Sequence, residues 1–311
     1  MKITGAAAAI VTPFTSKRIN EVDFGIDFAG LKKNVEFQNM HADFLVVNGT
    51  TGESPTLSEK EHEKVAEAVV DIAKIPVVAG TGSNSTREAL HYTKHAKDAG
   101  CDACLMVYPY YNRPPYDKVK KNYFGLIASK VDIPIIIYIV PSRTGKGTEL
   151  PVDDVVELAK EYPNIAGIKE ATGKTERTRE ILEKVGRKDF IVYSGDDNMN
   201  YEICRSGGLG TISVIANVLP DLMARQMKLL RDRRMNEAEK IQKVVDHFSD
   251  AVFLESNPIG IKEAMGLLGM PAGPLRPPLG KMSEENSAKV KEQLESLERQ
   301  GHLSSVHKFY G

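Results

Sequence analysis

The chain has 311 residues, a formal net charge of −1, and 41% hydrophobic and 27% charged residues. These values are ordinary for a globular protein and exclude a disordered chain, a collagen-like chain and a disulfide-stapled miniprotein. Lys+Arg (41) and Asp+Glu (42) are balanced, three cysteines are too few for a disulfide framework, and no apolar run is long enough for a membrane span. We therefore expect a cytoplasmic protein that binds neither nucleic acid nor a membrane.

The first part of the chain is a series of short, almost continuously apolar runs. The start, MKITGAAAAIVTPF, has no clear cleavage region, so we interpret it as a first strand rather than a leader peptide. The runs are AAAAIV near Ile10, FLVVNG (44–49), IPVVAGTG (75–82), ACLMVYP (103–109), IPIIIYIVP (133–141), IAGIKEAT (165–172), FIVYSGD (190–196) and GTISVIANV (210–218). Such runs are typical of parallel strands that are buried on both faces.

The segments between these runs carry helix signals. Residues 57–73 open with Ser58 and Glu61, the pattern of a capping box, and residues 85–100 begin at a serine and end at a glycine. One helix after each strand predicts an α/β protein with a (β/α)₈ TIM barrel over residues 1–225. The alternative, a doubly wound open sheet, usually has a glycine-rich first turn, which TPFTSKRIN lacks.

Strand signals stop after Pro220. We expect a C-terminal helical extension over residues 226–301 and a frayed tail over residues 302–311.

Lys169 lies in the middle of an apolar run, although a strand buried on both faces is an unfavourable place for an ammonium group. A buried lysine tends to lose its proton, and the neutral amine is a nucleophile that can form a Schiff base with a carbonyl. The alternative is a structural lysine that pairs with Glu170 or another carboxylate of the barrel.

Active sites of such barrels form at the carboxyl ends of the strands, where further polar groups occur. Tyr138, Tyr111 and Thr51 offer hydroxyls for a proton relay, or they only pack at the rim. The turn at residues 49–52 offers backbone N–H groups for a carboxylate or phosphate, or it is a plain turn. Arg143 suits carboxylate binding, or it is a surface arginine.

Four motifs resemble the dihydrodipicolinate synthase family of pyruvate-dependent Schiff-base aldolases. They are GTTGES (49–54), YPYYNRP (108–114), YIVPSRTG (138–145) and GIKEATG (167–173), and SGDD (194–197), GTISVIANV (210–218) and ESNPIGIK (255–262) also fit. The resemblance extends from Gly5 to about Leu279.

The resemblance implies a role for each candidate residue. Lys169 would form an imine with pyruvate, and Tyr138, Thr51 and Tyr111 would relay protons, with Tyr111 coming from a neighbouring subunit. The amides of Thr50 and Thr51 would bind the pyruvate carboxylate, Arg143 the carboxylate of L-aspartate 4-semialdehyde, and Gly195 and Ile212 would line the pocket. The family needs no metal or organic cofactor, and we expect a homotetramer built as a dimer of dimers.

Three departures loosen this assignment without removing a functional group. The chain has Ile139 where the synthases usually have Asn, Tyr108 where Thr or Ser is common, and Gly260 where Pro is common. A 2-keto-3-deoxy sugar acid aldolase or an enzyme like N-acetylneuraminate lyase is the alternative within the superfamily, although such enzymes generally lack Arg143. A non-catalytic metabolite-binding barrel and a metal-dependent barrel enzyme are alternatives of another class.

The resemblance also implies a possible feedback site for lysine. Its residues would be Ser54, His62, Asn84, Glu88 and Tyr110, whereas Pro55 and Glu59 depart from the lysine-responsive pattern.

Several weaker signals are interpreted as structural. Cys101 and Cys104 predict buried thiols, because no second cysteine pair follows them. His91 and His95 predict a solvated helix face, because no third ligand is within reach along the sequence. The glycines at 80–82 and 207–210 are interpreted as turn glycines.

Overall fold

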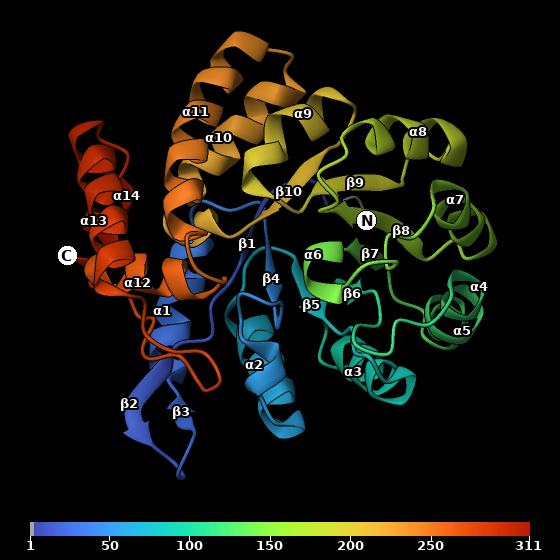
Figure 1. The fold of residues 1–311 in the computed structure, drawn as a ribbon, viewed down its shortest axis with the longest axis horizontal. Coiled ribbons are helices and arrows are strands. Elements are labelled where there is room, and N and C mark those ends of the chain that lie inside the picture. Colours follow the sequence, from blue (N-terminus) through green and yellow to red (C-terminus); the bar gives the residue numbers. More distant parts are fainter. Residues whose placement is uncertain (1–2) are drawn as a thin grey trace.

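The computed structural model describes residues 3–311, and it contains a closed barrel of eight parallel strands surrounded by helices (Figure 1). The strands are β1 (Gly5–Ala9), β4 (Phe44–Val47), β5 (Val77–Gly80), β6 (Ala103–Val107), β7 (Ile135–Ile139), β8 (Ile165–Glu170), β9 (Ile191–Ser194) and β10 (Gly210–Ser213). The barrel closes where β1 pairs with both β4 and β10. The predicted (β/α)₈ barrel is confirmed; residues 1 and 2 of its expected range lie outside the described residues.

The barrel strands are apolar throughout because each has two buried faces. Ala7, Val46, Ile136 and Ile212 belong to the core inside the barrel, whereas Ile168 belongs to the core between the barrel and its helices. Successive side chains of a strand point to opposite faces, so every second residue of each strand faces the interior. This alternation decides which side chains can reach the middle of the barrel.

Helices cover the outside of the barrel, and the two predicted from capping signals are confirmed. The helices of this layer are α1 (Phe28–Gln38), α2 (Glu59–Ile72), α3 (Thr86–Asp98), α4 (Tyr116–Val119), α5 (Gly125–Lys130), α7 (Val152–Glu161), α8 (Glu176–Val185), α9 (Asn200–Arg205) and α10 (Pro220–Arg231). The Ser58 amide donates to the Glu61 carboxylate at the start of α2 (2.9 Å), and the Ser85 hydroxyl accepts from the Glu88 amide in α3 (3.5 Å). Shorter helical segments are α6 (Pro141–Thr144), η1 (Ser54–Thr56), η2 (Lys120–Phe124), η3 (Asp197–Met199) and η4 (Ile215–Asn217).

A small antiparallel hairpin stands where we expected only the first turn. It is formed by β2 (Phe14–Arg18) and β3 (Phe24–Ile26), and it projects away from the barrel in Figure 1. Only Phe14 of β2 is buried, so the segment lacks the apolar alternation by which a strand is recognised in a sequence.

The C-terminal helical extension lies along one side of the barrel, drawn in orange to red in Figure 1. It consists of α11 (Met235–Val252), α12 (Ile259–Leu267), α13 (Glu284–Arg299) and α14 (Ser304–Tyr310). Position 225, the expected boundary, falls inside α10, which continues to Arg231. Helix α12 packs so closely on the end of α11 that a Cβ atom on Gly260 would lie 2.0 Å from the Val252 carbonyl oxygen.

The expectation of a frayed tail over residues 302–311 is wrong. The rings of Phe309 and Tyr310 lie 5.4 and 5.3 Å from the ring of Phe37 in α1, and the Tyr310 hydroxyl donates to Asn34 Oδ1 (2.9 Å). This aromatic contact gives α14 the tertiary packing that a short helix needs for stability. Among residues 3–311, no helix is both long enough and apolar enough to cross a bilayer.

Candidate active site

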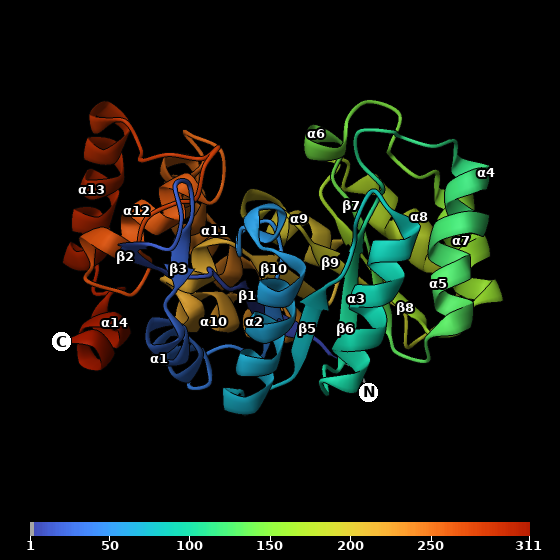
Figure 2. The same cartoon turned by 90° about the horizontal axis from the view of Figure 1, so that it is seen from below.

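A cavity of about 780 Å³ opens at the carboxyl ends of the barrel strands. In Figure 2 this face carries α6. The cavity gathers most of the residues predicted from the sequence: Thr50, Thr51, Ser54, His62, Glu88, Tyr110, Tyr138, Arg143, Lys169, Gly195 and Ile212. The strand ends therefore bring distant motifs into one site, as the barrel architecture requires.

Lys169 points into this cavity from the middle of the barrel wall. It is side by side with Tyr138 in the register of β7 and β8, and its Nζ lies 4.3 Å from the centroid of the Tyr138 ring. Only 6% of the residue is exposed. Burial lowers the pKa of Lys169 to about 8, against the opposing effect of the Asp197 carboxylate. A substantial fraction of the amine is therefore neutral near pH 8.

The alternative in which Lys169 pairs with Glu170 is wrong. Glu170 is the next residue of β8 and so points to the opposite face of the strand. There its carboxylate accepts hydrogen bonds from Arg177 Nε and Nη2, both at 3.2 Å. Among residues 3–311, no salt bridge includes Lys169.

Gly195, which follows β9, lines the cavity beside Lys169, and Asp197 is buried close to it. A Cβ atom on Gly195 would lie 3.0 Å from Lys169 Cε, so a larger residue would crowd the lysine side chain. The Asp197 carboxylate accepts from the amides of Val214 (2.9 Å) and Ile215 (3.2 Å), and burial raises its pKa. Burial also raises the pKa of Tyr138 to about 12, so its phenol stays protonated at neutral pH.

The loop that carries Thr50 and Thr51 has an unusual backbone. Asn48 and Glu53, at its two ends, both have positive φ angles (56° and 54°), which residues other than glycine rarely adopt. The Thr12 hydroxyl donates to the Gly52 carbonyl oxygen (2.7 Å), and Asn257 Nδ2 donates to Thr51 Oγ1 (3.0 Å). Contacts from both ends of the chain therefore hold the loop in this shape.

A buried group of charges underlies the same loop. Lys262 Nζ donates to Glu53 Oε1 (2.7 Å), and the Arg276 amide donates to Glu53 Oε2 (3.0 Å). The Arg276 guanidinium makes two hydrogen bonds to Glu61 (2.9 and 2.6 Å) and thereby lowers the pKa of Glu61 to about 2. Both cations lie 4.5 Å from the Phe14 ring centroid. Sequence reasoning missed this group, because its members are far apart along the chain.

Arg143 stands at the mouth of the cavity on the short helix α6. Its Nη2 donates to the Asn257 carbonyl oxygen (3.3 Å), and Phe253 and Ser256 complete the wall beside it. A guanidinium in this place can bind the carboxylate of a molecule that enters the cavity.

The other end of the cavity is lined by His62, Tyr92, Glu88 and Tyr110. His62 Nε2 donates to the Gly80 carbonyl oxygen (3.0 Å), and its ring stacks on Tyr92 with centroids 4.0 Å apart. Burial lowers the pKa of His62 to about 4, so this histidine is neutral at physiological pH. This end of the cavity therefore combines neutral aromatic side chains with one carboxylate.

Two predicted site residues are not part of this cavity. Tyr111 is 89% exposed and has a positive φ of 63°. Asn84 does not line the cavity, and its carbonyl oxygen accepts from Asn112 Nδ2 (3.3 Å). Sequence reasoning also missed Asn48 and Asn257 as parts of the site, although both lie in segments that it had singled out.

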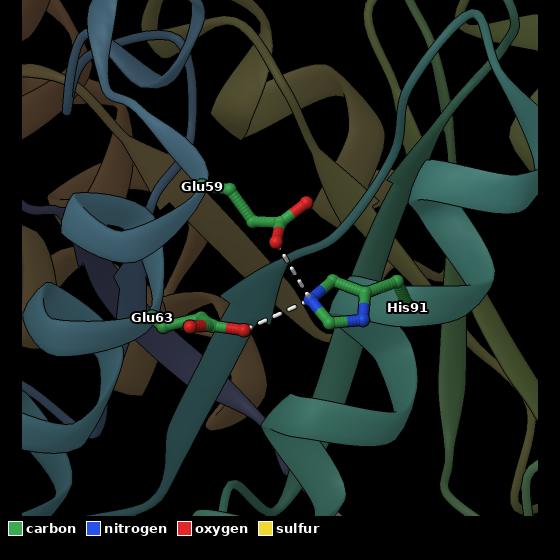
Figure 3. Close-up of side chains that lie close together, drawn as sticks. All are labelled: Glu59, Glu63 and His91. Atoms are coloured by element: carbon green, nitrogen blue, oxygen red, sulfur yellow. Dashed lines mark hydrogen bonds and ion pairs between the residues drawn. The ribbon is translucent and has the colours of Figure 1, made fainter.

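His91 is exposed, as expected for a solvated helix face, but two carboxylates that are distant along the sequence reach it. Glu59 and Glu63 of α2 lie beside it, with His91 Nε2 2.8 Å from Glu63 and 3.7 Å from Glu59 (Figure 3). None of the three residues lines the cavity. His95 Nε2 likewise donates to Glu67 Oε1 (3.0 Å), so these contacts form a hydrogen-bonded seam between α2 and α3.

The remaining structural interpretations concern cysteines and glycines. Cys101 and Cys104 are buried and unpaired, as expected. Gly207 has a φ of 110° and is a turn glycine, as expected. For Gly80 and Gly210 that interpretation is wrong, because they belong to β5 and β10; a Cβ atom on Gly80 would come within 2.2 Å of the Asn48 carbonyl oxygen.

Comparison with known proteins agrees with the motifs. The sequence model of the dihydrodipicolinate synthetase family matches residues 2–297. The chain is 45% identical over 294 residues to the 4-hydroxy-tetrahydrodipicolinate synthase of Methanosarcina barkeri, an alignment that covers 94% of this chain and 98% of that protein.

Two solved structures extend the comparison. A chloride-inhibited dihydrodipicolinate synthase of Acinetobacter baumannii complexed with pyruvate is 38% identical, with a TM-score of 0.88 and coverage of 94% of this chain and 98% of that one. An enzyme of Cyanidioschyzon merolae with lysine bound is 32% identical, with the same TM-score and coverage. The resemblance drawn from the four motifs is confirmed, and this chain belongs to the dihydrodipicolinate synthetase family.

Proposed function

We propose that the protein acts as a 4-hydroxy-tetrahydrodipicolinate synthase, which condenses pyruvate with L-aspartate 4-semialdehyde in the biosynthesis of diaminopimelate and lysine. The observation that carries this proposal is the Lys169 amine, which is buried, lacks a salt bridge among residues 3–311 and opens onto a cavity. Its pKa of about 8 supplies a neutral nucleophile.

The reaction follows from the chemistry of that amine. Lys169 Nζ adds to the C2 carbonyl of pyruvate and water leaves, which gives a protonated imine. The imine withdraws electrons, so C3 loses a proton and becomes an enamine carbon that attacks the aldehyde carbon. The amine of the second substrate then displaces Lys169 from C2 and closes the ring. Because the protonated imine is itself the electron sink, the proposed reaction uses no metal or organic cofactor.

The other cavity residues support these steps. Tyr138 donates and recovers protons, since its raised pKa keeps the phenol protonated. The amides of Thr50 and Thr51 bind the pyruvate carboxylate, and backbone oxygens of Gly195 and Ile212 line the pocket. The substrates are small molecules, and the reaction belongs in the cytoplasm.

Tyr111 completes the relay from a second copy of the chain. Its 89% exposure is unfavourable for a tyrosine with a catalytic role in its own subunit, and a neighbouring copy would cover it. We therefore propose a homo-oligomer, a tetramer built as a dimer of dimers.

Borohydride trapping tests the proposal directly. Treatment with pyruvate and borohydride should give a stable adduct on Lys169 that mass spectrometry detects, because hydride reduces the imine. Lys169→Ala should give no adduct and keep the circular dichroism spectrum of the fold. A wild-type protein that forms no adduct would contradict the proposal.

Arg143 separates the synthase from a sugar-acid aldolase. Arg143→Ala should still form the pyruvate adduct but lose turnover of aspartate semialdehyde, because the guanidinium binds the carboxylate of the aldehyde substrate. Turnover of 2-keto-3-deoxy sugar acids by the wild type, with aldehyde use unchanged in Arg143→Ala, would favour the aldolase.

The end of the cavity that contains Glu88 and His62 supports regulation by lysine. The Glu88 carboxylate suits an ammonium group, and Tyr110, Ser54 and the neutral His62 line the same end of the cavity. Asn84 lies in the chain segment next to it. Calorimetry should show heat on titration with millimolar lysine, and Glu88→Gln should remove it. The absence of heat with the wild type would exclude this regulation.

A further inference from the structure

We propose that Asn257 is a positioning residue that sets the direction in which the Thr51 hydroxyl donates its proton. The proposal rests on the proposed function, in which Thr51 belongs to the proton relay. Asn257 comes from the C-terminal extension, 206 residues away from Thr51 along the chain. The extension would thus take part in catalysis through one amide group.

Asn257 connects the two sides of the cavity. It is only 5% exposed, and its Nδ2 donates to Thr51 Oγ1 at 3.0 Å. Its backbone oxygen accepts from Arg143 Nη2 at 3.3 Å. The side chain therefore acts on the pyruvate side, whereas the main chain acts on the aldehyde side.

The hydrogen bond from Asn257 leaves the Thr51 proton unused. A hydroxyl has one proton to donate and two lone pairs that accept, and the Asn257 amide occupies one lone pair. Thr51 and Tyr138 both line the cavity, so in the proposed relay the Thr51 O–H is free to donate to the Tyr138 oxygen after Tyr138 has given its own proton to the substrate. A hydroxyl that donated to Asn257 instead could not reprotonate Tyr138.

Mutation of the Asn257 side chain can test its hydrogen bond to Thr51 separately from the other contacts of this residue. Among residues 3–311, the Asn257 side chain makes no other hydrogen bond, and its Oδ1 has no partner. Truncation of this side chain leaves the backbone oxygen that binds Arg143 in place. A change in kcat without a change in the KM of the aldehyde would therefore point to Thr51.

A double-mutant cycle of Thr51→Val and Asn257→Ala tests whether the two residues act as a unit. We expect Asn257→Ala to lower kcat about 10- to 100-fold, within the range of one acid–base group, with KM for both substrates little changed. The double variant should be no slower than Thr51→Val alone, because groups that act together are not additive. Effects that multiply would overturn the inference.

Asn257→Asp gives a second readout and preserves the side-chain volume if Asn257→Ala does not fold. An ionised carboxylate only accepts hydrogen bonds, so it would turn the Thr51 O–H away from Tyr138. We expect kcat of this variant to recover as the pH falls, because the carboxyl group then becomes protonated and can donate a hydrogen bond. Arg143 and Lys169 also face the cavity, and their charges act on the pKa of this carboxyl group. Asn257→Ala should lack this recovery, and parallel pH profiles of the two variants would contradict the inference.

Asn34→Ala is the matched control. Asn34 is another buried asparagine that bonds to the C-terminal region, through Nδ2 to the Pro271 carbonyl oxygen (2.7 Å), and it does not line the cavity. It should lower the melting temperature and leave kcat unchanged. Borohydride trapping of the wild type distinguishes failure of the proposed function from failure of this inference. If no adduct forms, the proposed function is refuted. If an adduct forms but the effects of Thr51→Val and Asn257→Ala multiply, only the role of Asn257 is refuted.

Discussion

Lys169 opposes folding at neutral pH while it prepares the site for chemistry. Burial depresses its pKa from 10.5 to about 8, which corresponds to about 3 kcal/mol of unfavourable free energy when the amine is protonated. The unfolded chain binds more protons than the folded one between these two values, so this contribution to stability improves as the pH rises from about 8 to 10.5. Such a cost is typical of a functional group rather than a structural one.

Lys169→Met should therefore stabilise the protein at pH 7. Methionine fills a similar volume without a charge, so we expect the free energy of unfolding to rise by about 1–3 kcal/mol. Urea denaturation at pH 7 and pH 10 measures this effect, and the gain should shrink at the higher pH. A variant that is destabilised equally at both pH values would show that the buried ammonium carries no such cost.

The same pKa predicts how the rate of pyruvate capture depends on pH. Because the neutral amine is the proposed nucleophile, the initial rate of borohydride-trapped adduct formation should rise with pH and level off above about 8. Trapping with a range of pH buffers measures it. A rate that is flat from pH 6 to pH 10 would place the controlling step elsewhere.

Sequence reasoning identified Lys169 and Arg143, because each lies in a motif that is continuous along the chain. It did not assign a role to Asn257, since the bond to Thr51 joins segments 206 residues apart. The direction of a side chain that is not in a regular strand cannot be derived from local periodicity. The position of Glu170, by contrast, follows from strand alternation once the run is known to be a strand.

At the scale of elements, the loop after β4 depends on the buried charges beneath it. Lys262→Met alone should destabilise the protein by about 3–5 kcal/mol, because it leaves the Glu53 carboxylate buried without its cation. The double variant Lys262→Met/Glu53→Gln should recover part of this loss. Urea denaturation measures both.

The exposed pair of Lys289 and Glu285 is the control for that experiment. Its Nζ–Oε1 distance is 2.7 Å, equal to that of Lys262 and Glu53, but both side chains are largely exposed. Lys289→Met should therefore change stability by less than about 1 kcal/mol. A similar loss in Lys262→Met and Lys289→Met would show that burial does not decide the effect.

The barrel strands were predictable as elements and the β2–β3 hairpin was not. Two buried faces leave a continuous apolar run in the sequence, whereas Phe14 is the only buried residue of β2. The order of the C-terminal tail was misjudged for a related reason. Phe309 and Tyr310 pack against Phe37, and a contact between residues so far apart along the chain leaves no local pattern in the sequence.

For the whole molecule, the exposure of Tyr111 predicts that two inactive variants restore each other. In the proposed mechanism, Lys169→Ala lacks the nucleophile and Tyr111→Phe lacks the hydroxyl that is offered to a neighbouring subunit. Subunit mixing should give one intact site in each mixed pair, and thus about a quarter of the wild-type activity when the subunits pair at random. Activity assays after joint refolding measure this recovery.

Each variant refolded alone serves as the control and should stay inactive or nearly so. If the mixture gained no activity, although size-exclusion chromatography showed mixed oligomers, Tyr111 would serve its own subunit or no site at all.

The tight seating of α12 on α11 has a consequence for how this sequence could change. Because a Cβ atom on Gly260 would come within 2.0 Å of the Val252 carbonyl oxygen, a proline at this position does not fit unless the two helices separate. Phe253, Ser256 and Asn257 of the neighbouring segment line the cavity, so that separation would change the cavity wall. Engineering of this chain should therefore leave Gly260 unchanged, because the geometry of the cavity wall depends on this close helix contact.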